Sequence, residues 1–346
     1  MKNSKKLGRN VIVLGFVSLC NDASSEMIYP LLPMFLTVTL GASAEMLGVI
    51  EGIAESTAAV LKLFSGWLSD KFKKRKIFIG SGYSLSAITR PLMAIATASW
   101  HVLFIRFGDR VGKGVRTAPR DAMIADSIDP AILGKAFGFH RAMDHIGAII
   151  GPLLAMAVLA LTANNYRTVF WIAAIPAFVG VAILFLRAKE IKMSSLAQAP
   201  SLRLRGFDGN FYFYLITIIL FTLGNSSDAF LLLRAKDLGV PATFIPLLWL
   251  VLHVVKMGSA MPGGSLSDKI GRKKIIILGW VIYALVYIGF ARASTSWHAW
   301  ALFAVYGLFF GLTEGTEKAF VADLVKAEQR GTAYGIFNFA IGIGAL

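Results

Sequence analysis

The residues best suited to bind a charged molecule form a row on one predicted helix, the fourth along the chain. At about 100° of rotation per residue, seven charged side chains fall within an arc of roughly 140° on one face of that helix. They are Arg106, Asp109, Arg110, Lys113, Arg116, Arg120 and Asp121. Five bases against two acids favour an anion, and arginine suits bidentate contacts with carboxylate or phosphate groups. The alternative is that these bases only neutralise Asp22, Glu51 and Glu55 on neighbouring helices.

Two pairs of carboxylates are spaced four residues apart, which puts each pair on one helix face. Asp22 and Glu26 form the first pair, and Glu51 and Glu55 form the second. Carboxylates one turn apart in a poorly hydrated region repel each other when both are ionised, which favours uptake of a proton by one of them. Both pairs are therefore candidates for proton coupling. Salt bridging to the charged row is the alternative.

Three more charged residues are candidates to contact the same solute: Arg141, Lys256 and Glu314. The sequence offers no credible nucleophile and base for an enzyme, and no two of its five histidines have convincing metal-ligand spacing. Its single cysteine, Cys20, excludes a disulfide framework and a CxxC redox centre. We therefore expect a binding site without catalytic residues, metal or cofactor.

Apolar helices must position these residues, because 56% of the 346 residues are hydrophobic and only 16% are charged. Soluble domains carry about 25% charged residues. Apolar segments of about 20 residues, enough to cross a ~30 Å hydrocarbon core, recur along the whole chain. The pattern predicts an all-α protein that crosses a lipid bilayer many times. We expect helices at 10–37, 44–68, 76–98, 100–124, 135–160, 166–187, 209–233, 244–268, 274–292 and 297–323, and a last one starting near 331.

The net charge of +15 is unevenly distributed between the two ends of these helices. If the spans simply alternate, 21 of the 35 Lys and Arg residues lie on the side of the N-terminal tail, and four lie on the opposite side. Basic loops stay in the cytoplasm during membrane insertion. The asymmetry predicts a cytoplasmic N-terminus, and it explains the basic composition without a nucleic-acid partner.

The two halves of the sequence repeat each other at an offset of 197 or 198 residues. Asp70 matches Asp268, and Trp100 matches Trp297. Because six spans separate equivalent residues, the halves have the same orientation. This predicts two parallel six-helix bundles, residues 1–187 and 209–346, joined by a polar cytoplasmic linker at 188–208. Residue 346 matches residue 149 within the fifth span, so we expect the two complete repeats to hold twelve helices and the chain to be truncated within the eleventh, with about 10.5 present.

A motif follows the second span as GWLSDKFKKR from Gly66, and it recurs after the eighth span as GSLSDKIGRK from Gly264. Both copies resemble the GxxxD(R/K)xG(R/K)(R/K) loop of the major facilitator superfamily, with Lys73 replacing the second glycine of the first copy. The stretch from Asn21 to Pro30 is similar to a bacterial permease subgroup of that family. The glycine allows close helix approach, and the aspartate suits bases or a helix N-terminus. The candidate residues for a conformational gate are Gly66, Asp70, Lys71, Arg75, Gly264, Asp268, Lys269 and Arg272.

The resemblance implies a secondary transporter that works by alternating access, with every third helix peripheral and the other helices around a central cavity. We expect it in the bacterial inner membrane as a monomer. The favoured substrate is a small organic anion or an anionic metal chelate, coupled to protons. Two alternatives stay open: a multidrug efflux antiporter, and a receptor or scaffold of the same fold that does not transport.

Overall fold

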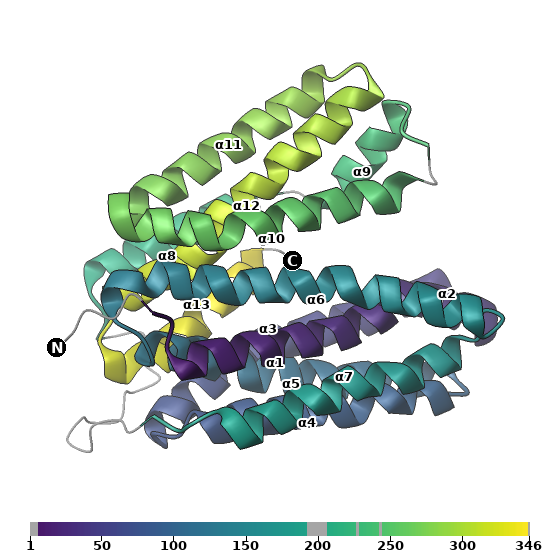
Figure 1. Cartoon of the computed structure of the whole chain (residues 1–346), viewed down its shortest axis with the longest axis horizontal. Helices are drawn as coiled ribbons and strands as arrows, with labels where there is room; N and C mark the ends of the chain where they lie inside the picture. The colour runs from purple at the N-terminus through teal and green to yellow at the C-terminus, as the bar shows by residue number, and fades with distance from the viewer. Residues whose placement is uncertain (1–5, 192–205, 226–227, 242–243, 345–346) are drawn as a thin grey trace.

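The computed structural model describes residues 6–191, 206–225, 228–241 and 244–344, and its regular elements are helices. In the first half these are α1 (Arg9–Ile28), η1 (Tyr29–Leu31), α2 (Leu32–Met34), η2 (Phe35–Thr39), α3 (Ala44–Lys71), α4 (Lys76–Leu92), η3 (Met93–Ile95), α5 (Ser99–Asp126), η4 (Pro130–Ile132), α6 (Leu133–Leu161) and α7 (Tyr166–Arg187). In the second half they are α8 (Gly209–Leu223), α9 (Asp228–Asp237), α10 (Ile245–Ile270), α11 (Arg272–Arg292), α12 (Ser296–Leu324), η6 (Ala327–Gln329) and α13 (Arg330–Gly344). Figure 1 labels the longer helices.

Five helical stretches are long and apolar enough to cross a membrane: Arg9–Thr39, Pro130–Leu161, Tyr166–Arg187, Ile245–Ile270 and Arg272–Arg292. Other long helices, α3, α5 and α12, have 28, 28 and 29 residues and carry charged residues within their length. Charges persist in a membrane only where they are paired or face a polar cavity. The charged side chains of these helices must therefore point into the molecule, and several of them line the cavity described below.

The expectation of one continuous helix over 209–233 is wrong. Helix α8 ends at Leu223, and the backbone N–H of Gly224 bonds back to carbonyl groups of the last turn, including that of Leu220. The side chain of the next residue, Asn225, accepts a hydrogen bond of 2.5 Å from the Tyr283 hydroxyl. Glycine and asparagine are poor helix formers, so the seventh span is divided and continues as α9.

The helices form two bundles that follow the sequence repeat. In the first bundle α1 packs against α6 and α7, while α5 packs against α3 and α4; in the second, α12 packs against α10 and α11. Helices α4, α7 and α11 lie at the outer edges of the molecule (Figure 1), which are the third, sixth and ninth spans. Between the bundles, α6 contacts α10 and α3 contacts α13. Of the expected linker at 188–208, residues 192–205 lie outside the described residues.

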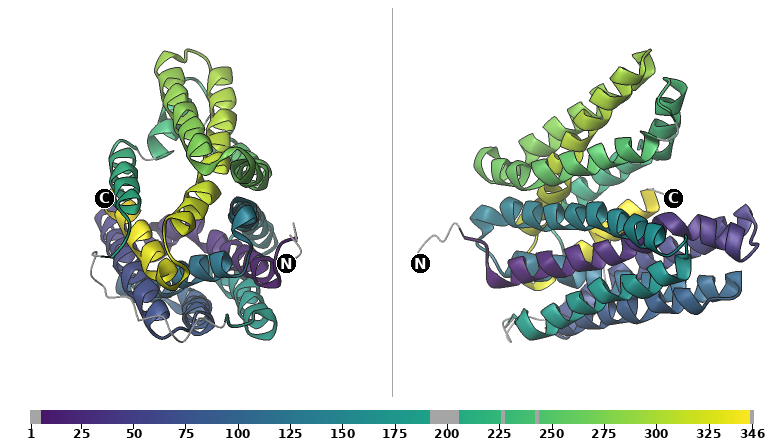
Figure 2. Two further views of the ribbon diagram at one scale, coloured as in Figure 1. Left: turned by 90° about the vertical axis from the view of Figure 1, so that its left-hand side faces the viewer. Right: turned by 45° about the vertical axis from the view of Figure 1, so that its right-hand side comes forward.

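The bundles are joined at one end and diverge at the other (Figures 1 and 2). We call the joined end the linker end, because the linker at 188–208 begins there after Arg187. The Arg9 side chain contacts the carbonyl of Arg187 at the same end. One hydrophobic core includes residues from both halves, such as Phe137 and Tyr334. Two further cores are each confined to one half, around Phe35 in the first and Phe303 in the second. The halves thus share a core at the linker end and have separate cores at the opposite end.

Candidate functional site

A cavity of about 500 Å³ lies on the inner face of the first bundle. Among the residues that the structure describes, nineteen line it, and each carries a polar group: Asn21, Asp22, Ser25, Glu26, Tyr29, Glu55, Lys62, Arg90, Arg106, Asp109, Arg110, Lys113, Arg116, Thr117, Arg120, Arg141, Asp144, Lys318 and Asn338. Nine of them are basic and five are acidic. Only Lys318 and Asn338 come from the second half, so the cavity belongs mainly to the first.

Helix α5 supplies the largest share of the lining. Six of the seven charged residues in its row line the cavity, and only Asp121 does not. The helix continues through Pro119 as far as Asp126, so the row stays on one face. Gly112 and Gly114 allow the close packing of α5: a Cβ atom on them would lie 2.6 Å from the Gly82 carbonyl oxygen and 2.6 Å from Leu61, respectively.

Five arginines at the cavity have carboxylate partners, and three of them pair with acids on another helix of the first bundle. Arg106 contacts both oxygens of Glu51 at 3.0 and 2.8 Å. Arg110 lies 3.0 Å from Glu55, and Arg90 lies 3.3 Å from Asp109. For these side chains the geometry favours the structural interpretation, in which the bases neutralise acids on other parts of the first bundle.

Arg116 and two lysines have no carboxylate partner among the described residues. The Arg116 guanidinium donates to the Ser86 hydroxyl at 2.6 Å and lies over the Tyr83 ring. Lys62 on α3 and Lys113 on α5 line the cavity half-buried, and neither makes a hydrogen bond or ion pair with a residue that the structure describes. A partly desolvated ammonium without a partner is costly, so these two lysines are the natural contacts for a bound anion.

The two candidate proton-coupling pairs have different surroundings. Asp22 and Glu26 both line the cavity from α1, and Asp22 accepts a hydrogen bond of 2.8 Å from the Asn21 amide. Glu55 also lines the cavity but is engaged by Arg110. Glu51 is held by Arg106 and lies outside the lining.

Two candidate binding residues lie outside the cavity. The Lys256 ammonium lies 3.3 Å from the centre of the Phe310 ring. Glu314 lies 3.6 Å from Arg141 and 3.3 Å from His145. These two contacts connect α12 to α6. Arg141 itself is in the lining.

Four charged residues of the lining were not candidates from the sequence: Lys62, Arg90, Asp144 and Lys318. The sequence repeat could have identified Lys318, because it lies 197 residues after Asp121, at the equivalent position of the second half.

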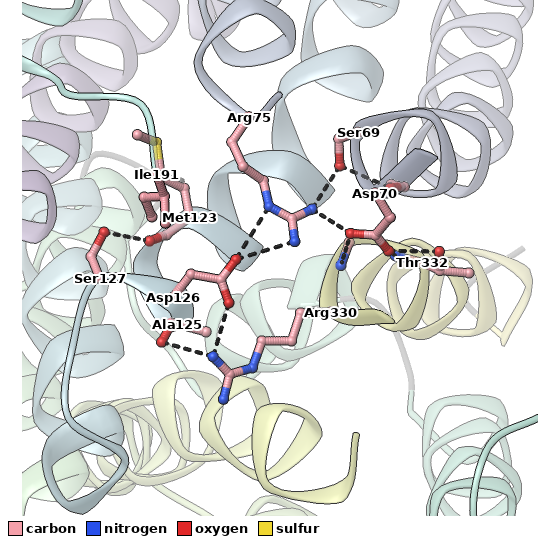
Figure 3. Close-up of polar contacts among 12 residues, drawn as sticks. Ser69, Asp70, Arg75, Met123, Ala125, Asp126, Ser127, Ile191, Arg330 and Thr332 are labelled. Atoms are coloured by element: carbon pink, nitrogen blue, oxygen red, sulfur yellow. Dashed lines mark hydrogen bonds and ion pairs between the residues drawn. The ribbon is translucent and has the colours of Figure 1, made fainter. Parts of the chain in front are cut away.

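The first gate motif connects α3 to the start of α13. The Asp70 carboxylate accepts hydrogen bonds from the backbone N–H groups of Gly331 and Thr332, at 3.0 and 2.6 Å, and from the Thr332 hydroxyl at 2.7 Å (Figure 3). Arg75 donates to the same carboxylate at 2.5 Å. Free N–H groups and the helix dipole make a helix N-terminus a good partner for a carboxylate. The contact ties the first bundle to the second.

The second gate motif makes the same contact in the opposite direction, from α10 to the start of α6. Asp268 accepts hydrogen bonds from the backbone N–H groups of Gly134 and Lys135, both at 2.8 Å, and from Arg272 at 2.7 Å. Lys71 lies over the Trp67 ring, and Lys269 lies in the last turn of α10. The two aspartates therefore close the linker end on both sides of the molecule.

The gate glycines place backbone against backbone at these two crossings. A Cβ atom on Gly66 would lie 2.1 Å from the Gly331 carbonyl oxygen, and one on Gly264 would lie 2.0 Å from that of Gly134. With the shared core, these contacts join the two bundles at the linker end.

A family model described as Major Facilitator Superfamily matches residues 14–346. An uncharacterized MFS-type transporter, MJ1317 of Methanocaldococcus jannaschii, is 34% identical over 100% of this chain and 88% of its own length. The multi-drug resistance efflux pump PmrA of Streptococcus pneumoniae is 23% identical over 88% of this chain and 78% of the pump. A bacterial homologue of the iron transporter ferroportin, solved in an outward-facing state, has the same fold: TM-score 0.73 and 17% identity over 97% of this chain and 90% of that one.

Proposed function

Because the chain belongs to the Major Facilitator Superfamily, a family of membrane transporters rather than enzymes, we propose that it carries a small hydrophilic anion across the membrane. One observation supports this more than any other. The cavity is lined by nine bases and five acids, and Lys62 and Lys113 among them make no ion pair or hydrogen bond with a described residue. Its volume of about 500 Å³ lies in the range of small-molecule sites, about 300–1,000 Å³.

The geometry supports alternating access as the mechanism. In this structure the bundles are joined at the linker end, so an anion enters from the opposite end. For release on the other side, the hydrogen bonds of Asp70 to α13 and of Asp268 to α6 must break while the diverging ends close. Both motifs act at the same end, so a single rocking motion changes both contacts.

Uptake into proteoliposomes tests this function directly. We expect vesicles containing the protein to accumulate a small di- or tricarboxylate or a phosphate ester well above the level in protein-free vesicles. A lipophilic cation should not compete for this uptake. Uptake of such cations without any anion uptake would contradict the proposal, and binding without flux would favour a receptor or scaffold.

Drug efflux is the second candidate function, because PmrA is a multidrug pump. Pockets for amphipathic molecules are mostly apolar with a few polar groups. Every lining residue of this cavity carries a polar group, so the cavity itself supports the anion.

For the orientation we propose that the linker end faces the cytoplasm of a bacterial cell. The basis is the unequal distribution of Lys and Arg between the two sides. In a Cys20→Ser background, a cysteine at Lys74 should be protected from an impermeant thiol reagent in intact cells, while one at Asn164 should react. Both positions are exposed in the structure. Labelling of position 74 but not of position 164 would reverse the orientation.

For the coupling we propose that Asp22 and Glu26 exchange protons as the anion binds and leaves. Both line the cavity with the bases, so an anion competes with the carboxylates for the same positive charges. Two ligands are coupled when each changes the free energy of binding the other.

We expect Asp22→Asn and Glu26→Gln to abolish accumulation driven by a pH gradient while anion exchange partly persists, measured in proteoliposomes with and without the gradient. The control is Glu45→Gln, since Glu45 is exposed at the start of α3. Full gradient-driven accumulation in both variants, or a strict need for sodium in the parent, would contradict this assignment.

A further inference from the structure

Asp121 and Lys318 form an ion pair between the two bundles at equivalent positions of the repeat. The Lys318 ammonium lies 2.6 Å from the Asp121 carboxylate, and the two residues are 197 apart in sequence. In a parallel repeat, equivalent residues meet each other only at the axis that relates the halves. At that axis an identical pair of acids or bases would repel, and this chain has one of each.

The pair lies between the cavity and the first gate. Asp126 at the end of α5 lies 3.1 Å from Arg75 of the first gate motif. Asp121 is five residues deeper on the same helix, about 7.5 Å at 1.5 Å per residue. Lys318 lines the cavity and Asp121 does not. Both side chains are buried, with 5% and 0% of their surface exposed.

Opening the linker end moves α12 away from α5, which separates this pair. Asp121 would keep a partner, because Arg120 on its own helix donates to its other oxygen at 3.1 and 3.2 Å. Lys318 would lose the one carboxylate with which it pairs among the described residues, and Arg120 and Arg141 both repel its charge. Breaking a buried ion pair is strongly unfavourable when one charge is left without compensation.

We propose that Lys318 transfers from Asp121 to the transported anion, so that a bound anion of at least two negative charges is the condition for opening the linker end. This inference rests on the proposed function. Lys318 is the only lining base from the second half among the described residues. An anion held by Lys62 and Lys113 in the first bundle and by Lys318 in the second contacts all three ammonium groups and compensates at least two of their charges. A monovalent anion leaves most of that charge uncompensated. With a monovalent anion or with none, the linker end therefore stays closed.

The test measures how often the linker end is open with and without an anion. Spin labels at Lys74→Cys and Lys274→Cys in a Cys20→Ser background report the distance between the bundles at that end, since both positions are exposed and lie on different bundles. The probes are citrate and inorganic phosphate, applied to the protein in nanodiscs. In the parent we expect a short distance without anion and a long one with either probe.

In Lys318→Gln the long distance should already be present without anion, at least tenfold more populated than in the parent, and the probes should add little to it. The affinity for citrate should fall about 10- to 100-fold, because the variant loses one charged contact. Asp121→Asn removes the same ion pair by neutralising its acid. It should also open without anion, but it should bind citrate at least as tightly as the parent.

The matched control is Arg330→Gln. Arg330 also joins the halves, lying 2.9 Å from Asp126, and Asp126 keeps Arg75 at 3.1 Å. Since Arg330 does not line the cavity, this variant should open more easily and still respond to citrate, with at least the parent affinity. If Lys318→Gln keeps the short distance without anion, opens with citrate and binds citrate with the parent affinity, the inference is overturned and the proposed function is left intact. If neither probe binds the parent, the anion function itself fails.

Discussion

Replacing both Lys62 and Lys113 by methionine is expected to abolish anion uptake while the protein still folds and reaches the membrane. Each lysine lines the cavity and makes no ion pair or hydrogen bond with a described residue. Glu55, which attracts both lysines, keeps Arg110 at 3.0 Å, so the change leaves no acid unpaired. A hydrogen bond to a charged group contributes about 1.5–3 kcal/mol. Each single variant should therefore lose about one to two orders of magnitude in affinity, and the double variant should transport nothing measurable in proteoliposomes.

The control for charge removal is Lys74→Met, an exposed lysine at the linker end, which should transport at the parent rate. Arg106 is a poor choice for this experiment. Its loss would leave the partly buried Glu51 without the two contacts of 3.0 and 2.8 Å, and a failure to fold would look like a failure to bind. Normal uptake by the double lysine variant would show that the anion binds elsewhere.

Most of the fold could be predicted from the sequence because its signals are local. Apolar length sets the helices, and the repeat at 197 or 198 residues sets the two bundles. The row on α5 was also predictable, since rotation per residue alone puts Lys113 and its neighbours on one face. The division of the seventh span was harder to predict, because Gly224 and Asn225 lie in an otherwise apolar stretch.

The pairing of charges could not be predicted, because it depends on which helices meet and at what height. The spacing of Glu51 and Glu55 is the same as that of Asp22 and Glu26. Only the packing of α3 against α5 engages Glu51 and Glu55, with Arg106 and Arg110 respectively. In the same way, helix packing places the Lys256 ammonium over the Phe310 ring and outside the cavity lining.

Substituting alanine for either gate glycine is expected to hold the linker end open and to reduce transport to a small fraction of the parent rate. The Cβ atom of Gly264→Ala would lie 2.0 Å from the Gly134 carbonyl oxygen, and that of Gly66→Ala would lie 2.1 Å from the Gly331 carbonyl oxygen. Each clash is with backbone of the other bundle, so no side-chain rotation relieves it. The bundles themselves must separate, which also removes the hydrogen bonds of Asp268 or Asp70.

Each of these helices provides its own control for the glycine substitutions. A Cβ atom on Gly258 of α10, or on Gly52 of α3, would meet nothing within 4 Å. Since alanine favours a helix over glycine by up to about 1 kcal/mol, Gly258→Ala and Gly52→Ala should be as active as the parent and at least as stable. The distance between labels at Lys74→Cys and Lys274→Cys separates the two outcomes. If Gly264→Ala keeps the short distance and the parent transport rate, the glycine crossing does not hold the linker end closed, and the gate depends on the aspartates alone.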